Sequence, residues 1–287
     1  MSSAETLQAA NAAADHYEET ALLDGRVRLL QPPKAEGAYR AAMDSVLLAA
    51  CVTVRPGDSL LDAGAGTGAV ALSLSARLGP VFAGTGLEIL DSARALAQRS
   101  AALQEHGSAW RFVQGDLLDP SCRETLSGPF DQVVSNPPFA ASGTASPNAV
   151  REAAMRGVGR GVRRGVERGE GARAQEVSVE NWIAACLACL RPKGRLTLIQ
   201  RADMLDRVLA ALRGQGAGEV AILPIRQNPT APARRVVVSA RRGIKSPCCL
   251  LPDFLLEQGE GRPTDRAVGV FRHAEAIPMS VLPHKIQ

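Results

Sequence analysis

The chain has 287 residues, of which 46% are hydrophobic and 22% are charged, and its formal net charge is +4. This composition excludes global disorder, and the length suits one large α/β domain with additions or about two average domains. No apolar run reaches the roughly 18 residues that a membrane span needs, and residues 1–20 lack the basic start and apolar centre of a signal peptide. We expect a soluble, cytoplasmic protein with no membrane partner.

Apolar runs of strand length alternate with stretches of helical spacing along most of the chain. The predicted strands are Ser59–Ala63, Val81–Ile89, Trp110–Gln114, Asp131–Ser135, Arg195–Gln200, Val220–Ile225 and Arg235–Ala240. The predicted helices are Val70–Leu78, Asp91–Glu105, Ser178–Leu190 and Asp203–Gly214, with Asp91, Ser178 and Asp203 as N-caps. The pattern indicates an α/β fold with a seven-stranded, mainly parallel sheet and helices on both faces. The last two strands leave no room for a crossover helix between them, so we expect them to form an antiparallel pair, with an antiparallel strand at one edge of the sheet.

The flanks of this core suggest a division of the chain. Arg26–Leu30 and the turn-rich segment 31–38 predict a small hairpin that leads into a helix at Asp44–Val52. The predicted parts are a flexible N-terminus (1–22), a hairpin and helix (23–57), a core (58–243) and a C-terminal extension (244–287).

One segment of the core has low complexity. Residues 156–171 read RGVG-RGVR-RGVE-RGEG, and each interior glycine disfavours a helix by roughly 1 kcal/mol relative to alanine. We expect 156–173 to be an inserted Arg/Gly-rich loop. Its arginines could contact RNA phosphates, or the repeat could be a neutral expansion.

A glycine-rich turn follows the first core strand. The motif is Asp62-Ala-Gly64-Ala-Gly66-Thr-Gly68, and a helical stretch comes directly after it. Glycines permit a tight turn and let the backbone touch a ligand at the carboxyl end of a strand, where open α/β sheets bind. By itself the motif fits a dinucleotide as well as S-adenosylmethionine.

Two acidic residues lie where the next predicted strands end. Glu88 could accept hydrogen bonds from both hydroxyls of a ribose, and Asp116 is placed to accept one from an adenine amino group. Either acid alone could be a solvated loop residue. Together with Asp62 and the glycines, they form a candidate nucleoside-binding set.

The most informative motif is Asn136-Pro137-Pro138-Phe139, directly after the strand Asp131–Ser135. An amine conjugated to a purine or a carbonyl is a poor nucleophile because its lone pair is delocalised. Acceptors on its hydrogens, the Asn136 side-chain oxygen and the Pro137 carbonyl, would hold the nitrogen and favour its pyramidalisation as it attacks a methyl sulfonium. The prolines preset the backbone, and Phe139 offers a face on which a base can stack.

The order and spacing of these motifs resemble class I S-adenosylmethionine-dependent methyltransferases of the branch with an Asn-Pro-Pro-aromatic tetrad. Gly37-Ala-Tyr39-Arg40-Ala-Ala-Met-Asp44, Pro232-Ala-Arg-Arg-Val-Val-Val and Lys245-Ser-Pro resemble more closely the bacterial tRNA adenine-N6 methyltransferases that act on the anticodon-loop adenine of valine tRNA. The resemblance spans about residues 22 to 280.

The resemblance implies a Rossmann-like fold, S-adenosylmethionine as cofactor and tRNA as partner. The resemblance implies that one set of residues contacts the cofactor: Asp62, Gly64, Gly66, Gly68, Glu88, Asp116 and Asn136. It assigns Asn136, Pro137, Pro138 and Phe139 to the target amine, and it places Arg40 and Asp44 near the pocket. The Arg/Gly insert departs from the family pattern.

Two alternative functions stay open. Glutamine-N5 methyltransferases of translation factors carry the same tetrad, but they usually have a helical domain ahead of the core, and only about 57 residues precede the first core strand here. The chain could also be a non-catalytic RNA-binding module on a methyltransferase fold. No metal is expected, because Cys186 and Cys189 have no second ligand pair at zinc spacing. The sequence does not indicate the oligomeric state.

Overall fold

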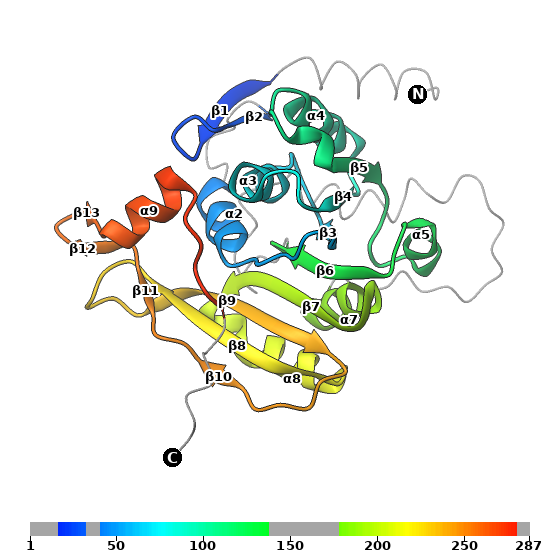
Figure 1. The fold of residues 1–287 in the computed structure, drawn as a ribbon. Coiled ribbons are helices and arrows are strands. Elements are labelled where there is room, and N and C mark those ends of the chain that lie inside the picture. The colour runs from blue at the N-terminus through cyan, green and yellow to red at the C-terminus, as the bar shows by residue number, and fades with distance from the viewer. Residues whose placement is uncertain (1–16, 33–40, 138–177, 280–287) are drawn as a thin grey trace, which may run out of the picture.

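The computed structural model describes residues 17–32, 41–137 and 178–279. Arg40, Pro138, Phe139 and the Arg/Gly insert lie outside these ranges. A central sheet carries helices on both of its faces (Figure 1), as predicted. The helices of the described chain are α2 (Ala41–Ala50), α3 (Ala69–Leu78), α4 (Asp91–Ala102), α5 (Pro120–Thr125), α7 (Val179–Ala188), α8 (Leu205–Gly214) and α9 (Asp265–His273).

The sheet has nine strands in the order β10-β8-β9-β7-β6-β3-β4-β5, with β11 also paired to β8. The core strands are β3 (Ser59–Ala63), β4 (Ala83–Glu88), β5 (Trp110–Gln114), β6 (Phe130–Ser135), β7 (Leu190–Arg201), β8 (Ala217–Arg226) and β9 (Ala233–Arg242). Each overlaps one of the seven predicted strands, because buried strands of a mainly parallel sheet read as apolar runs. One hydrophobic cluster lies under α2, α3 and α9, and a second lies under α7 and α8.

The predicted antiparallel pair on one side of the sheet is confirmed, since β8 and β9 pair, but neither is the outermost strand. Strand β9 is antiparallel, but it lies between β7 and β8 and pairs with both. The edge beyond β8 is covered by two short parallel strands of the C-terminal segment, β10 (Cys249–Leu250) and β11 (Phe254–Leu255). They satisfy the backbone groups that β8 would otherwise expose. Two-residue strands carry no sequence periodicity, and this is why seven strands were expected instead of nine.

The N-terminal hairpin exists, but its turn was predicted in the wrong place. Strands β1 (Glu18–Leu22) and β2 (Val27–Gln31) pair across a turn in which Leu23, Asp24 and Gly25 have φ values of 52°, 56° and 86°. An Asp-Gly pair is a strong hairpin signal because it tolerates positive φ. The expected boundary at residue 22 therefore falls inside the hairpin, and residues 18–22 form a strand. A second short hairpin, β12 (Glu257–Gly259) with β13 (Arg262–Pro263), precedes α9.

One of the three predicted helix caps is confirmed. The Ser178 hydroxyl accepts a hydrogen bond from the Asn181 amide at 3.1 Å. The other two predicted caps are wrong, since α4 and α8 are capped by Leu90 and Met204. Asp91 instead pairs with Arg94 in the first turn, and Asp203 pairs with Arg201 ahead of the helix.

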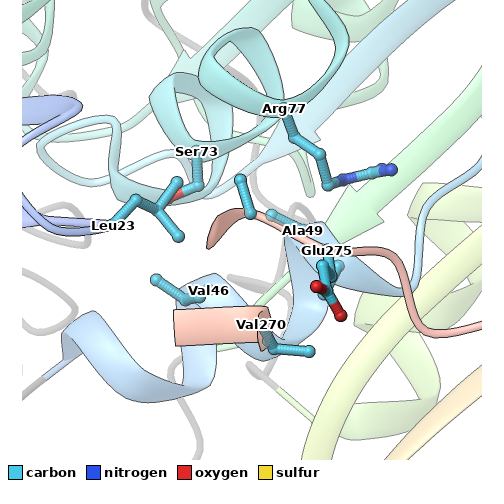
Figure 2. A pocket seen from close by; sticks show the side chains of 9 residues that line it. Leu23, Val46, Ala49, Ser73, Arg77, Val270 and Glu275 are labelled. Carbon is cyan, nitrogen blue, oxygen red and sulfur yellow. The ribbon is translucent and has the colours of Figure 1, made fainter. Parts of the chain in front are cut away.

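The C-terminal segment closes one side of the core. Helix α9 packs beside α2, and the Ile277 amide donates to the Ala50 carbonyl at 2.8 Å. Figure 2 shows Leu23, Val46 and Val270 around a small cavity in this contact. Its volume of about 10 Å³ admits at most one water molecule, so it cannot serve as a substrate site. None of the helices in the described ranges is long and apolar enough to cross a membrane.

If the C-terminal strands belong to the cooperative core, their buried side chains contribute to global stability. Phe254 is 1% exposed, whereas Leu250 is 67% exposed on the same edge. We expect Phe254→Ala to lower the free energy of unfolding by about 3–5 kcal/mol. Leu250→Ala is the matched control and should change it by less than about 0.5 kcal/mol. Urea unfolding measures both, and equal effects would contradict the assignment.

Candidate functional site

The predicted motifs gather at one edge of the sheet. Strands β6, β3, β4 and β5 are parallel neighbours, so their carboxyl ends meet there. The glycine-rich turn leaves β3, Glu88 ends β4, Asp116 follows β5 and Asn136 follows β6. Open α/β sheets bind their ligands at this edge, in the crevice beyond the strands.

The glycine-rich turn has a backbone that most side chains would strain. Gly64, Gly66 and Gly68 have φ values of 78°, 56° and 90°. The amides of Gly64 and Ala65 both donate to the Leu87 carbonyl at 2.9 Å, and this ties the turn to β4. Helix α3 starts immediately afterwards, so its unpaired N-terminal amides lie beside the turn.

Glu88 is 8% exposed and holds the glycine turn against the end of β4. One carboxylate oxygen accepts from the Gly66 amide at 2.8 Å, and the other accepts from the Leu90 amide at 2.9 Å. A carboxylate oxygen has two lone pairs, so both oxygens keep capacity for a ligand hydroxyl. Asp116 has a similar arrangement, because its Oδ1 accepts from the Leu118 amide at 2.9 Å.

Among the acidic side chains at this edge, Asp62 has the fewest hydrogen bonds. It is 1% exposed, and neither of its carboxyl oxygens makes a hydrogen bond of good geometry, although the Ala71 amide lies close enough to act on its pKa. Burial raises the pKa of Asp62 to about 7; the Ala71 amide opposes this and the Glu88 carboxylate adds to it. Such a group favours a ligand that brings donors or positive charge.

The end of β6 carries the predicted target-binding residues. Asn136 is half-buried and Pro137 is buried, whereas Pro138 and Phe139 lie outside the described residues. Gln200, near the end of neighbouring β7, was not predicted. Its Oε1 accepts from the Arg201 amide, while its buried Nε2 has no partner. The available signal was a polar side chain directly after the apolar residues Leu198 and Ile199.

Two of the outer motifs that carried the family resemblance meet in space. Asp44 on α2 is 8% exposed, and its Oδ2 accepts from Arg235 Nε at 3.0 Å, at the start of β9. Arg235 faces Arg201 at the carboxyl end of β7. Burial raises the pKa of Asp44, although the Arg235 charge opposes the shift. The ion pair therefore fixes α2 near the candidate site.

No group of three or more His, Cys, Asp or Glu side chains suited to a metal ion occurs in the part of the chain that the structure describes. Cys186 and Cys189 are free, buried thiols. Burial raises the pKa of Cys189 to about 11, so this thiol is protonated at neutral pH.

Comparison with known proteins agrees with this geometry. Residues 38–159 match the family model of the methyltransferase small domain. A solved structure from Agrobacterium tumefaciens, described as a predicted O-methyltransferase, superposes with a TM-score of 0.64 at 22% identity. The match covers 83% of this chain and 100% of that one, and it shows that the fold is a methyltransferase fold.

Two names recur among the curated relatives of this chain. A "tRNA1(Val) (adenine(37)-N6)-methyltransferase" of Porphyromonas gingivalis is 32% identical over 58% of this chain and 61% of its own length. A relative of the same name from Aeromonas hydrophila is 23% identical over 80% of this chain and 88% of its own length. A "Release factor glutamine methyltransferase" of Chlorobaculum tepidum is 35% identical over 41% of this chain and 39% of its own length.

The raised pKa of Asp62 predicts an unusual pH dependence of stability. Between pH values of about 4 and 7, the folded chain holds a proton on Asp62 that the unfolded chain has lost. The free energy of unfolding should therefore fall as pH rises through this window, by a few kcal/mol in total. Asp62→Asn removes the contribution, so the ligand-free variant should gain stability relative to wild type as pH rises. Urea unfolding at pH 4.5 and pH 8 checks this, and parallel profiles would refute it.

Proposed function

We propose that this protein is an S-adenosylmethionine-dependent N6-adenine methyltransferase that acts on tRNA, with the anticodon-loop adenine of valine tRNA as its target. The observation that carries the proposal is the placement of Asn136 at the same sheet edge as the glycine turn, Glu88 and Asp62. A methyl donor and an amine acceptor can be brought together there. Because tRNA is matured in the cytoplasm, a cytoplasmic location is part of the proposal.

The residues at this edge fit S-adenosylmethionine. Its ribose hydroxyls suit the Glu88 carboxylate, its adenine amino group suits Asp116, and its ammonium supplies the donors that the unpartnered Asp62 oxygens lack. The positive φ values at Gly64, Gly66 and Gly68 provide a turn without side chains against which a ligand can lie. When bound, the cofactor supplies an electrophilic methyl sulfonium.

The protein's own contribution to the reaction would be to hold and orient the target amine. The Asn136 side-chain oxygen and the Pro137 carbonyl would accept the two N6 hydrogens, which keeps the nitrogen lone pair pointed at the methyl group. Both acceptors would stabilise the positive charge that develops on nitrogen. The target adenine would have to leave its stack, and this costs least in a loop.

Adenine in tRNA is favoured over the rival substrates. The relatives named as tRNA methyltransferases reach 80% of this chain, whereas the release-factor relative aligns with 41% of it. The half-buried Asn136 and the carboxylates around the glycine turn also favour an enzyme over a non-catalytic module, since binding RNA alone requires neither.

Two substitutions should separate target binding from cofactor binding. Asn136→Ala should lower kcat on the order of a hundredfold while leaving the Kd for S-adenosylmethionine nearly unchanged, because the main role proposed for the lost oxygen is to accept from the target amine. Glu88→Ala should act mainly on the Kd for S-adenosylmethionine and weaken cofactor binding by about 1.5–3 kcal/mol. Calorimetry and single-turnover methylation measure the two effects. An active Asn136→Ala enzyme would eliminate the proposed mechanism.

The substrate class can be tested without choosing a substrate beforehand. The protein is incubated with labelled S-adenosylmethionine and either total RNA or total protein, and the products are digested to nucleosides or amino acids. We expect the label in N6-methyladenosine from tRNA. Label in protein glutamine would support the first rival, and cofactor binding with no transfer would support the non-catalytic module.

A further inference from the structure

The chain has two tryptophans, and each donates its indole N–H to a buried serine. Trp182 on α7 donates to Ser135 Oγ at 3.0 Å, and Trp110 on β5 donates to Ser75 Oγ at 2.9 Å. Ser135 immediately precedes Asn136, at the carboxyl edge of the sheet. Trp110 begins β5, so its pair lies toward the opposite edge. The chain thus contains the same contact once at the candidate site and once away from it.

Ser135 extends the contact between β3 and β6 beyond the end of their backbone pairing. The last paired residues of these strands are Asp62 and Val134. One residue further on, the Ser135 hydroxyl donates to the Ala63 carbonyl at 2.8 Å. An indole N–H can only donate, so Ser135 must accept from Trp182 and direct its own hydrogen to Ala63.

The ring of Trp182 also limits the position of the glycine turn. A Cβ atom placed on Gly64 would lie 3.2 and 3.3 Å from two ring carbons of Trp182. The ring is 8% exposed and the Ser135 side chain is fully buried, so neither can move without disturbing its neighbours. The Trp182 side chain therefore contacts both the turn after β3 and Ser135, which directly precedes Asn136.

We propose that Trp182 and Ser135 are positioning residues for methyl transfer, which fix the distance between the glycine turn that holds the cofactor and the Asn136 strand end that holds the amine. The inference rests on the proposed function. It adds two residues that touch neither reactant and act through Ala63, Gly64 and Asn136. Their loss should impair the chemical step more than the binding of either reactant, because small misplacements reduce rates steeply.

The serine pair gives the first test. Ser135→Ala and Ser75→Ala each remove one buried hydroxyl that accepts from an indole. With saturating cofactor and tRNA, Ser135→Ala should lower kcat about tenfold or more, with little change in KM or in the cofactor Kd. Ser75→Ala should keep the wild-type kcat. If both variants keep it, the positioning role is wrong.

The tryptophan pair gives a second, matched test. Trp182→Phe should lower kcat like Ser135→Ala, and the double variant should be no slower than the slower single variant, because both changes break one network. Trp110→Phe should keep the wild-type kcat even if its melting temperature falls as much as that of Trp182→Phe. Full additivity of Trp182→Phe and Ser135→Ala, or an equal kcat loss in Trp110→Phe, would overturn the proposal.

Fluorescence separates this inference from the proposed function. Trp110→Phe leaves Trp182 as the sole tryptophan, and its emission should change when S-adenosylhomocysteine binds. Trp182→Phe, which retains only Trp110, should show no change. A wild-type protein that binds this ligand but methylates no RNA would refute the proposed function. An active enzyme in which the emission of Trp182 does not change on binding would refute only the positioning role.

Discussion

The arrangement of the site depends on where the backbone ladder between β3 and β6 stops. Pairing between these two strands ends at Asp62 and Val134, although Ala63 still pairs with Leu87 of β4 and Ser135 with Leu198 of β7. Backbone groups freed there must find other partners, since unpaired buried groups are costly. Ser135 bonds the Ala63 carbonyl, Leu87 accepts two turn amides, and Glu88 accepts a third. These substitute bonds set the course of the backbone at the carboxyl ends of the strands, where we propose that the ligand lies.

Electrostatics adds a second constraint at the same place. Asp62 and Glu88 are both buried beside the glycine turn, but only the Glu88 oxygens accept backbone hydrogen bonds of good geometry. An unpartnered buried carboxylate destabilises the fold, so Asp62 retains a proton up to a pH of about 7. The structure thus gives up some stability in the absence of ligand, as proteins commonly do at functional sites.

The parts outside the core hold the site's surroundings in place. Asp44 and Arg235 join α2 to the start of β9, and α9 also packs against α2. The C-terminal strands cover the outer edge of β8. The flanking motifs that contain Asp44 and Arg235 therefore lie next to the core, and the ion pair between these two side chains joins them.

The sequence by itself determined the strands of the core, the glycine turn, the acids at Glu88 and Asp116, and Asn136 at the end of β6. Local signals suffice for these because apolar runs, glycines and prolines restrict the backbone over short distances. Tertiary structure decided the place of β9 inside the sheet and the edge strands β10 and β11. It also decided the partners of Trp182, Gln200 and Arg235. These features arise from contacts between segments far apart in the chain, such as Asp44 with Arg235 and Ser135 with Trp182, which no local pattern records.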